Sequence, residues 1–135
     1  MNRLLVIGLI PTLFLVAIAG AVAYTKADTA PRQAHSVFFT LKDRTPEARA
    51  EFVKSCQKYL TGHKGAVSVS FGTIAEDVVE PNVSVRDFDV SLLVVFENKE
   101  AGQKYLVSPR HKEFVEKNKE KFAKVRVFDS YLAAE

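Results

Sequence analysis

The chain has 135 residues, room for one domain, and its composition (47% hydrophobic, 26% charged) is globular and excludes a disordered or fibrous protein. The formal net charge of +3 is small and no stretch concentrates it, so we expect no nucleic-acid partner. The single cysteine, Cys56, excludes an intramolecular disulfide and a thiolate zinc site, and its place in an apolar helical stripe predicts that it is buried.

Residues 1–23 are predicted to be a signal peptide or a membrane anchor. Arg3 precedes twenty uncharged residues, 4–23, that end in Ala21-Val22-Ala23, a pattern typical of a secretory signal cleaved after Ala23. Twenty apolar residues are also long enough to span a bilayer, so an uncleaved anchor is the alternative. The sequence thus predicts an exported protein, periplasmic or extracellular, or one that meets the membrane only through residues 4–23. N-terminal sequencing of the exported protein distinguishes the two.

Residues 24–34 are small and polar and are predicted to be a tether. A strand follows over His35–Leu41, and its alternate residues Val37 and Phe39 are expected to pack against helices. Thr45 as N-cap and Pro46 at the first helical position predict the start of a helix. That helix is expected to stop at Gly62, because glycine tolerates the left-handed backbone of a C-terminal cap.

The next strands are predicted over residues 66–73 and 86–96, with a loop over 75–85 between them. In the strand 86–96 one face carries a row of apolar residues, namely Phe88, Val90, Leu92, Val94 and Phe96. Leu93 and Val95 make the other face apolar as well. A strand that is apolar on both faces is covered on both. The domain's own helices can cover one face, and we expect a second copy of the sheet to cover the other.

A helical region is predicted from Lys99, and Ser108-Pro109 is expected to restart it. Its buried face is predicted to run to Phe122, a last strand to occupy 125–132, and residues 133–135 to form a tail. The order β-α-β-β-α-β predicts an α+β, ferredoxin-like domain over residues 35–132 with a four-stranded antiparallel sheet.

Several segments also carry a family resemblance. These are residues 35–43 (HSVFFTLKD), residues 88–96, the spacing Tyr105-x3-Pro109-x-His111 and residues 127–131 (VFDSY). Together they resemble the stress-responsive α/β-barrel (Dabb) family over about residues 35–132. The resemblance implies a ferredoxin-like monomer that pairs sheet to sheet into a dimeric α/β barrel, a homodimer with no cofactor. It also implies a stress-related or small-ligand-binding module of unassigned activity.

The resemblance extends to a possible site. In olivetolic acid cyclase, a plant polyketide cyclase of this family, a His on the first strand and a Tyr and a His on the last helical region surround a small cavity. They promote an aldol-type ring closure without metal or cofactor. The matching positions here are His35, Tyr105 and His111, which carry the same residue types.

The chemistry of this trio supports two readings. A neutral imidazole can abstract a proton alpha to a carbonyl, and a tyrosine hydroxyl can donate to the enolate oxygen that develops. Equally, His35 can be a packed strand residue, Tyr105 a core aromatic, and His111 a side chain bonded to backbone at a helical break. Tyr105 and His111 are six residues apart, on different faces of an unbroken helix, so they converge only if the break at Ser108 reorients the chain.

Three functions follow from these readings. The first is the binding of a small apolar ligand in a cavity between sheet and helices. The second is a cofactor-independent lyase, cyclase or isomerase that uses the trio for proton transfer. The third is haem or quinol oxygenation, which no further ligating residue supports. His63 is expected in an exposed turn, and three scattered histidines without ligand spacing predict no metal site.

Overall fold

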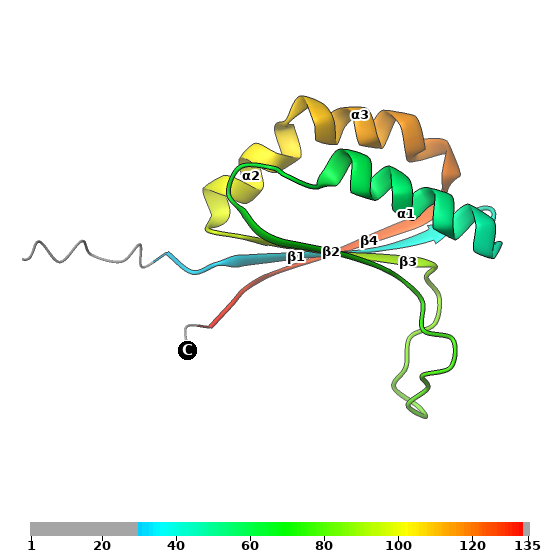
Figure 1. Ribbon diagram of the computed structural model, residues 1–135. Helices are drawn as coiled ribbons and strands as arrows, with labels where there is room; N and C mark the ends of the chain where they lie inside the picture. The colour runs from blue at the N-terminus through cyan, green and yellow to red at the C-terminus, as the bar shows by residue number, and fades with distance from the viewer. Residues whose placement is uncertain (1–29, 134–135) are drawn as a thin grey trace, which may run out of the picture.

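The computed structural model describes residues 30–133, in which a four-stranded sheet carries every helix on one face (Figure 1). In chain order the elements are β1 (Gln33–Leu41), α1 (Pro46–Leu60), β2 (Ala66–Thr73), β3 (Val90–Phe96), α2 (Lys99–Val107), α3 (Pro109–Asn118), a 3₁₀ turn (Lys119–Lys121) and β4 (Phe122–Tyr131). The strand order is β2-β3-β1-β4 and each neighbouring pair is antiparallel. The predicted α+β, ferredoxin-like fold is therefore confirmed.

The predicted leader and most of the tether lie outside the described residues. None of the helices that the structure describes is long and apolar enough to cross a membrane.

The predicted helix starts are confirmed by their hydrogen bonds. Thr45 caps α1, its side chain accepting from the Ala48 amide, and Pro46 occupies the first turn. Ser108 both ends α2 and caps α3, because its hydroxyl accepts from the His111 amide at 3.3 Å. The chain therefore breaks and restarts its helix at Ser108, as the sequence predicts.

The core lies between the sheet and the helices. Phe39 of β1 packs on Phe52, Phe114 and Phe122, with ring centroids 4.9–6.3 Å apart in edge or tilted contacts. The expectation that this face of β1 meets the helices is confirmed. Cys56 is fully buried, as predicted, and burial raises the pKa of its thiol to about 12, so the thiol is unreactive near neutral pH.

Three strand boundaries differ from the prediction. β1 begins at Gln33 rather than His35, because Gln33 pairs with Phe96 on one side and Tyr131 on the other, and this double pairing outweighs its polarity. β4 begins at Phe122 rather than Val125, so Phe122 packs into the core from a strand and not from a helix.

The third strand is shorter than predicted, because it begins at Val90 rather than Arg86. The Arg86 guanidinium donates to the backbone carbonyls of Val78 and Glu76 at 3.1 and 2.7 Å, which holds Arg86 in a loop. Phe88 does not share the face of Val90 as expected, because its ring packs on Phe38, 5.0 Å away on the other face of the sheet.

A buried carboxylate joins this loop to the domain. Asp89 is fully buried, and its oxygens accept from the Leu41 amide (2.9 Å), from Arg44 (3.0 Å) and from Arg49 (2.9 Å). Burial alone would raise the pKa of Asp89, but these hydrogen bonds and charges outweigh it and the pKa lies below its usual value. Arg49 also binds Glu76 at 2.6 Å, so the two ends of the loop are held by one side chain.

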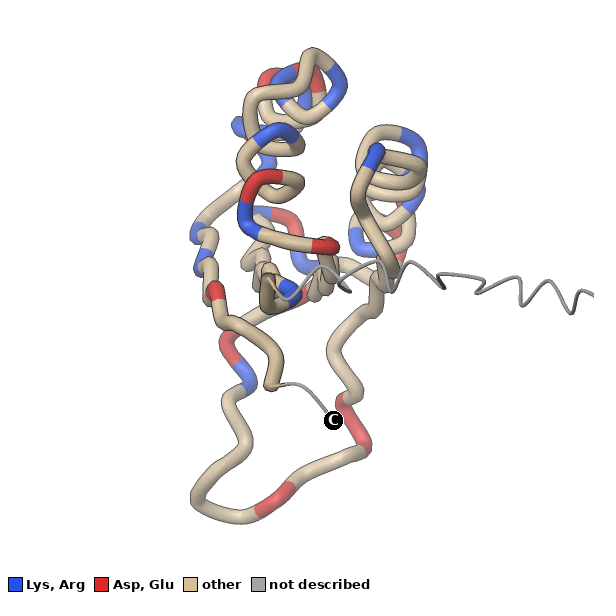
Figure 2. The backbone as a smooth tube through the Cα atoms, turned by 90° about the vertical axis from the view of Figure 1, so that its left-hand side faces the viewer, with Lys and Arg blue, Asp and Glu red and all other residues tan. Residues whose placement is uncertain are grey.

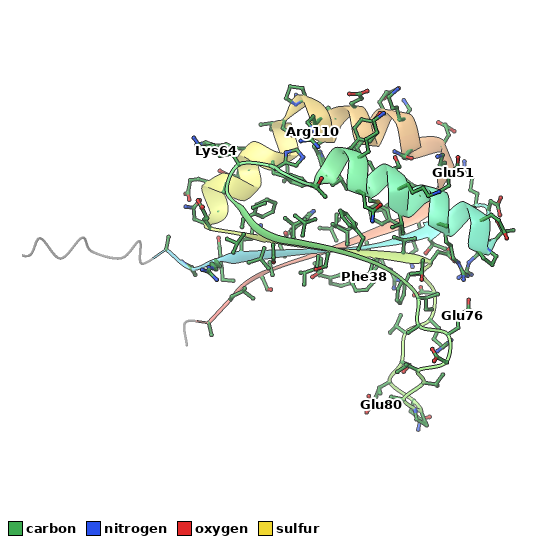
Figure 3. The ribbon with its side chains drawn as sticks, in the orientation of Figure 1. Phe38, Glu51, Lys64, Glu76, Glu80 and Arg110 are labelled. Atoms are coloured by element: carbon green, nitrogen blue, oxygen red, sulfur yellow. The ribbon has the colours of Figure 1, made fainter. Side chains whose placement is uncertain are left out.

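The sheet face opposite the helices, which we call the open face, carries an apolar patch among serine side chains of β1, β2 and β3. It carries Phe38 of β1, labelled in Figure 3, and Leu93 and Val95 of β3, with Arg126 and Phe128 of β4 beside them. Leu93 is 40% exposed and Phe128 is 56% exposed. This finding agrees with the prediction that β3 is apolar on both faces, and it leaves the apolar patch of the open face uncovered in the described chain.

Candidate functional site

A cavity of about 280 Å³ lies between the sheet and helices α2 and α3. Its walls are mostly apolar, and the half-exposed side chains of Val115, Val125 and Val127 line it where α3 meets β4. The polar exceptions include His35, Tyr105 and His111. Apolar pockets with a few polar groups are typical of small-molecule sites, and this volume lies just below their usual range of about 300–1,000 Å³.

The helical break brings the trio together. The ring centroids of Tyr105 and His111 are 4.7 Å apart, and those of Tyr105 and His35 are 6.1 Å apart. Because Ser108 turns the chain out of α2 and restarts it in α3, His111 faces back toward Tyr105 instead of lying on another side of one helix. All three predicted residues thus line one cavity.

His35 is oriented by a carboxylate on the neighbouring strand. Asp129 lies directly opposite His35 in the β1–β4 register, and its Oδ1 is 2.8 Å from His35 Nδ1. A carboxylate accepts, so Nδ1 carries the proton and, in the neutral ring, Nε2 is the nitrogen with a free lone pair. Gln33 Nε2 donates to the same oxygen at 3.2 Å. This arrangement holds one imidazole in a form that can accept a hydrogen bond or a proton.

Tyr105 is the most buried of the three, with 2% of its surface exposed. Its hydroxyl finds no hydrogen-bond partner among the described residues. Burial, and to a smaller extent the nearby Cys56 thiol, raise the pKa of Tyr105 above its usual value, so it remains a neutral donor. A buried hydroxyl without a partner costs about 1–3 kcal/mol, and this cost is recovered if a ligand accepts its hydrogen bond.

We expected His63 to be exposed in a turn. Its side chain is instead half-buried and packs against Tyr105. The two ring centroids are 4.8 Å apart, and His63 Nε2 donates to the Tyr59 carbonyl at 2.9 Å. All three histidines of the chain therefore surround one tyrosine. The sequence carries no signal for His63, because a turn of the α1–β2 connection places it.

His111 is tuned toward its neutral form. Burial lowers the pKa of His111 from 6.5; a hydrogen bond with the Leu106 backbone opposes this, and the charges that His35 and His63 acquire on protonation add to it. Near pH 7 the ring is therefore neutral and can accept a hydrogen bond or a proton.

This shift predicts a pH dependence of stability. Between the lowered pKa and 6.5 the unfolded chain binds more protons at His111 than the folded chain, so the free energy of unfolding falls as the pH drops through 6.5. We expect urea midpoints to fall from pH 7.5 to 5.5, and to fall less in His111→Gln. An identical pH slope in His111→Gln and wild type would contradict the assignment.

A second, polar cleft of about 330 Å³ lies on the other side of Tyr105, beside His63, Lys64 and Lys104. It lacks His35 and His111, so the apolar cavity is the better candidate for a site. Within residues 30–133 no cluster of three or more His, Cys, Asp or Glu side chains could hold a metal ion.

A comparison with known protein families matches almost all of the described residues. The family model described as "Stress responsive A/B Barrel Domain" matches residues 34–132. None of the curated proteins compared with the chain matches it.

Solved structures share the fold at low sequence identity. A Dabb family protein from Mesorhizobium loti is 20% identical, with a TM-score of 0.64 over 77% of this chain and 99% of its own. A dimeric ferredoxin-like protein of unknown function from Thermobifida fusca is 13% identical, with a TM-score of 0.62 over 77% and 93%. Hydroxynitrile lyase from Passiflora edulis is 16% identical, with a TM-score of 0.61 over 78% and 96%. These likenesses concern the fold alone.

Proposed function

The chain belongs to the stress responsive A/B barrel domain family, and from that premise we propose that it is an exported homodimer that binds a small apolar ligand. The ligand carries one hydrogen-bond acceptor, such as a carbonyl oxygen. One observation carries this proposal: the Tyr105 hydroxyl is buried and has no hydrogen-bond partner among the described residues, and Tyr105 is one of the residues that line the apolar cavity. The polyketide-cyclase likeness of the trio is not needed for it.

The side chains that line the cavity indicate the class of ligand. Aliphatic and aromatic side chains supply the hydrophobic contact area, and a neutral Tyr105 supplies a donor. The neutral His111 is an acceptor or donor beside it. The one Lys or Arg among the residues that line the cavity, Lys119, is half-exposed and already paired with Glu116. A neutral ketone or aldehyde therefore fits better than a carboxylate.

Dimerisation is the second part of the proposal. On the open face Leu93 of β3 and Phe128 of β4 are exposed on either side of Ser36 of β1, and exposed apolar patches of this kind mark interaction sites. The Thermobifida fusca protein of the same fold is dimeric. Export is the third part and depends on residues 1–23 alone.

A titration with 2-heptanone tests the ligand proposal, with calorimetry as the readout. We expect the wild type to bind this ketone, and Leu106→Trp to lower the affinity at least tenfold, because Leu106 lines the cavity. Val107→Trp is the matched control: Val107 is the next residue, is 64% exposed and does not line the cavity. Binding that is absent, or equal in the two variants, would contradict the proposal.

The second candidate is proton transfer, favoured by the His35–Asp129 pair at 2.8 Å. His35 Nε2 would take a proton from the carbon alpha to the carbonyl, the electron pair would move onto the oxygen, and Tyr105 would donate to that oxygen. Return of the proton restores the ketone. In D₂O this chemistry exchanges the alpha hydrogens of 2-heptanone for deuterium, and NMR follows the exchange. If the exchange is no faster than in buffer, the proton-transfer proposal is wrong and only the ligand-binding proposal stands.

A further inference from the structure

The segment between β2 and β3, residues 74–89, projects past the open face of the sheet, on the side away from the helices (Figure 1). We call it the arm. Toward its tip, where Glu80 is labelled in Figure 3, it carries acidic and uncharged residues (Figure 2). Its most unusual feature is four exposed valines, Val78, Val79, Val83 and Val85, with exposed fractions of 57–67%.

The arm is held in place by polar contacts. Arg49 fixes its two ends through Glu76 and Asp89, and Arg86 crosses from one limb to the carbonyls of the other. At the tip, the Glu80 amide donates to the Ser84 hydroxyl at 2.7 Å. The arm therefore has a defined shape that does not depend on burial of its valines.

The arm is continuous with the apolar patch of the open face. Val85 of the arm lines a hollow of about 360 Å³ together with Phe38, Phe88, Arg126 and Phe128. Whatever covers the open face thus meets the arm as well. Scattered apolar residues on a surface are ordinary, but four valines within eight residues, continuous with an apolar patch of the sheet, are not.

From this continuity we propose that the arm grips a second copy of this chain, so that its valines pack on the partner subunit beyond the sheet-to-sheet contact. The inference rests on the proposed homodimer and names a further surface for it. In a two-fold dimer the same contact occurs twice, since each arm reaches the other subunit. A substitution in the arm therefore removes two contacts from each dimer.

Sedimentation equilibrium of the full chain tests the inference. The double variant Val79→Asn, Val83→Asn should raise the dimer dissociation constant at least tenfold without unfolding the protein, because both side chains are exposed in the subunit. Val107→Asn, an exposed valine on α2, is the matched control and should change nothing. A dimeric wild type with an unchanged constant in the arm variant overturns the arm contact alone. A monomeric wild type overturns the dimer proposal itself.

Alkylation gives an independent readout. The only native thiol, Cys56, is buried and unreactive, so a cysteine introduced as Val79→Cys reports on the arm alone. We expect maleimide labelling of Val79→Cys to be at least tenfold slower above the dissociation constant than below it, whereas Val107→Cys labels equally fast at both concentrations. Equal rates for Val79→Cys in dimer and monomer overturn the inference.

Discussion

Leu93→Asp is expected to split the proposed dimer into folded monomers. Leu93 is central on the open face, where its neighbours in the strand register are Ser36 and Ser70. In a face-to-face dimer the new carboxylate would be buried without a partner on both subunits, and removing such a charge from water costs several kcal/mol. In the separate subunit Leu93 is 40% exposed, so the fold itself tolerates the charge.

Light scattering at micromolar concentration measures the effect as a halved mass, with circular dichroism as the check on folding. Val107→Asp is the control, because it places the same charge at an exposed valine of α2. A dimer that persists in Leu93→Asp would show that the open face is not the interface.

Asp89→Asn is expected to lower the free energy of unfolding by about 3–5 kcal/mol, the range for breaking one partner of a buried ion pair. The variant leaves the guanidinium of Arg49, whose side chain is 15% exposed, without its buried counter-charge. It also weakens the bonds from Arg44 and Leu41 that join the arm to β1 and α1. Urea denaturation of both proteins provides the measurement.

A surface pair supplies the control for this loss. Glu116 and Lys119 form an i,i+3 pair with both side chains largely exposed, so Glu116→Gln should change the free energy of unfolding by less than about 1 kcal/mol. Equal, small effects of Asp89→Asn and Glu116→Gln would mean that the buried carboxylate does not hold the arm.

Much of the fold could be predicted from local patterns. Thr45-Pro46 and Ser108-Pro109 mark helix starts because their hydroxyls and fixed φ act within one turn, and both starts are confirmed. Strand ends were less predictable, because they depend on partners distant in the sequence. Gln33 joins β1 through pairing on both sides, and Arg86 leaves β3 through bonds to the carbonyls of the arm.

The residues of the candidate site also differ in whether the sequence predicts them. His35, Tyr105 and His111 were predicted from a family resemblance, and the break at Ser108 supplied a local reason for their convergence. Asp129 and His63 could not be assigned roles beforehand. Asp129 meets His35 only through the β1–β4 register, and a turn between α1 and β2 places His63. Contacts that depend on register or on a turn carry no short-range signal.

A substitution at Tyr105 distinguishes a ligand-binding site from a packed core without a ligand. If it were only a core aromatic, Tyr105→Phe would remove a buried hydroxyl without a partner and change little else. Such a change is neutral or stabilising, because the desolvation cost of the hydroxyl disappears. The proposed function adds a second consequence, since a ligand carbonyl would lose its donor.

The affinity of Tyr105→Phe for 2-heptanone therefore tests the ligand proposal most directly. A hydrogen bond contributes about 0.5–1.5 kcal/mol, so we expect the affinity to fall by about threefold to tenfold, while urea denaturation shows a stability equal to or above that of the wild type. Unchanged affinity in Tyr105→Phe, or no binding to either protein, would contradict the account.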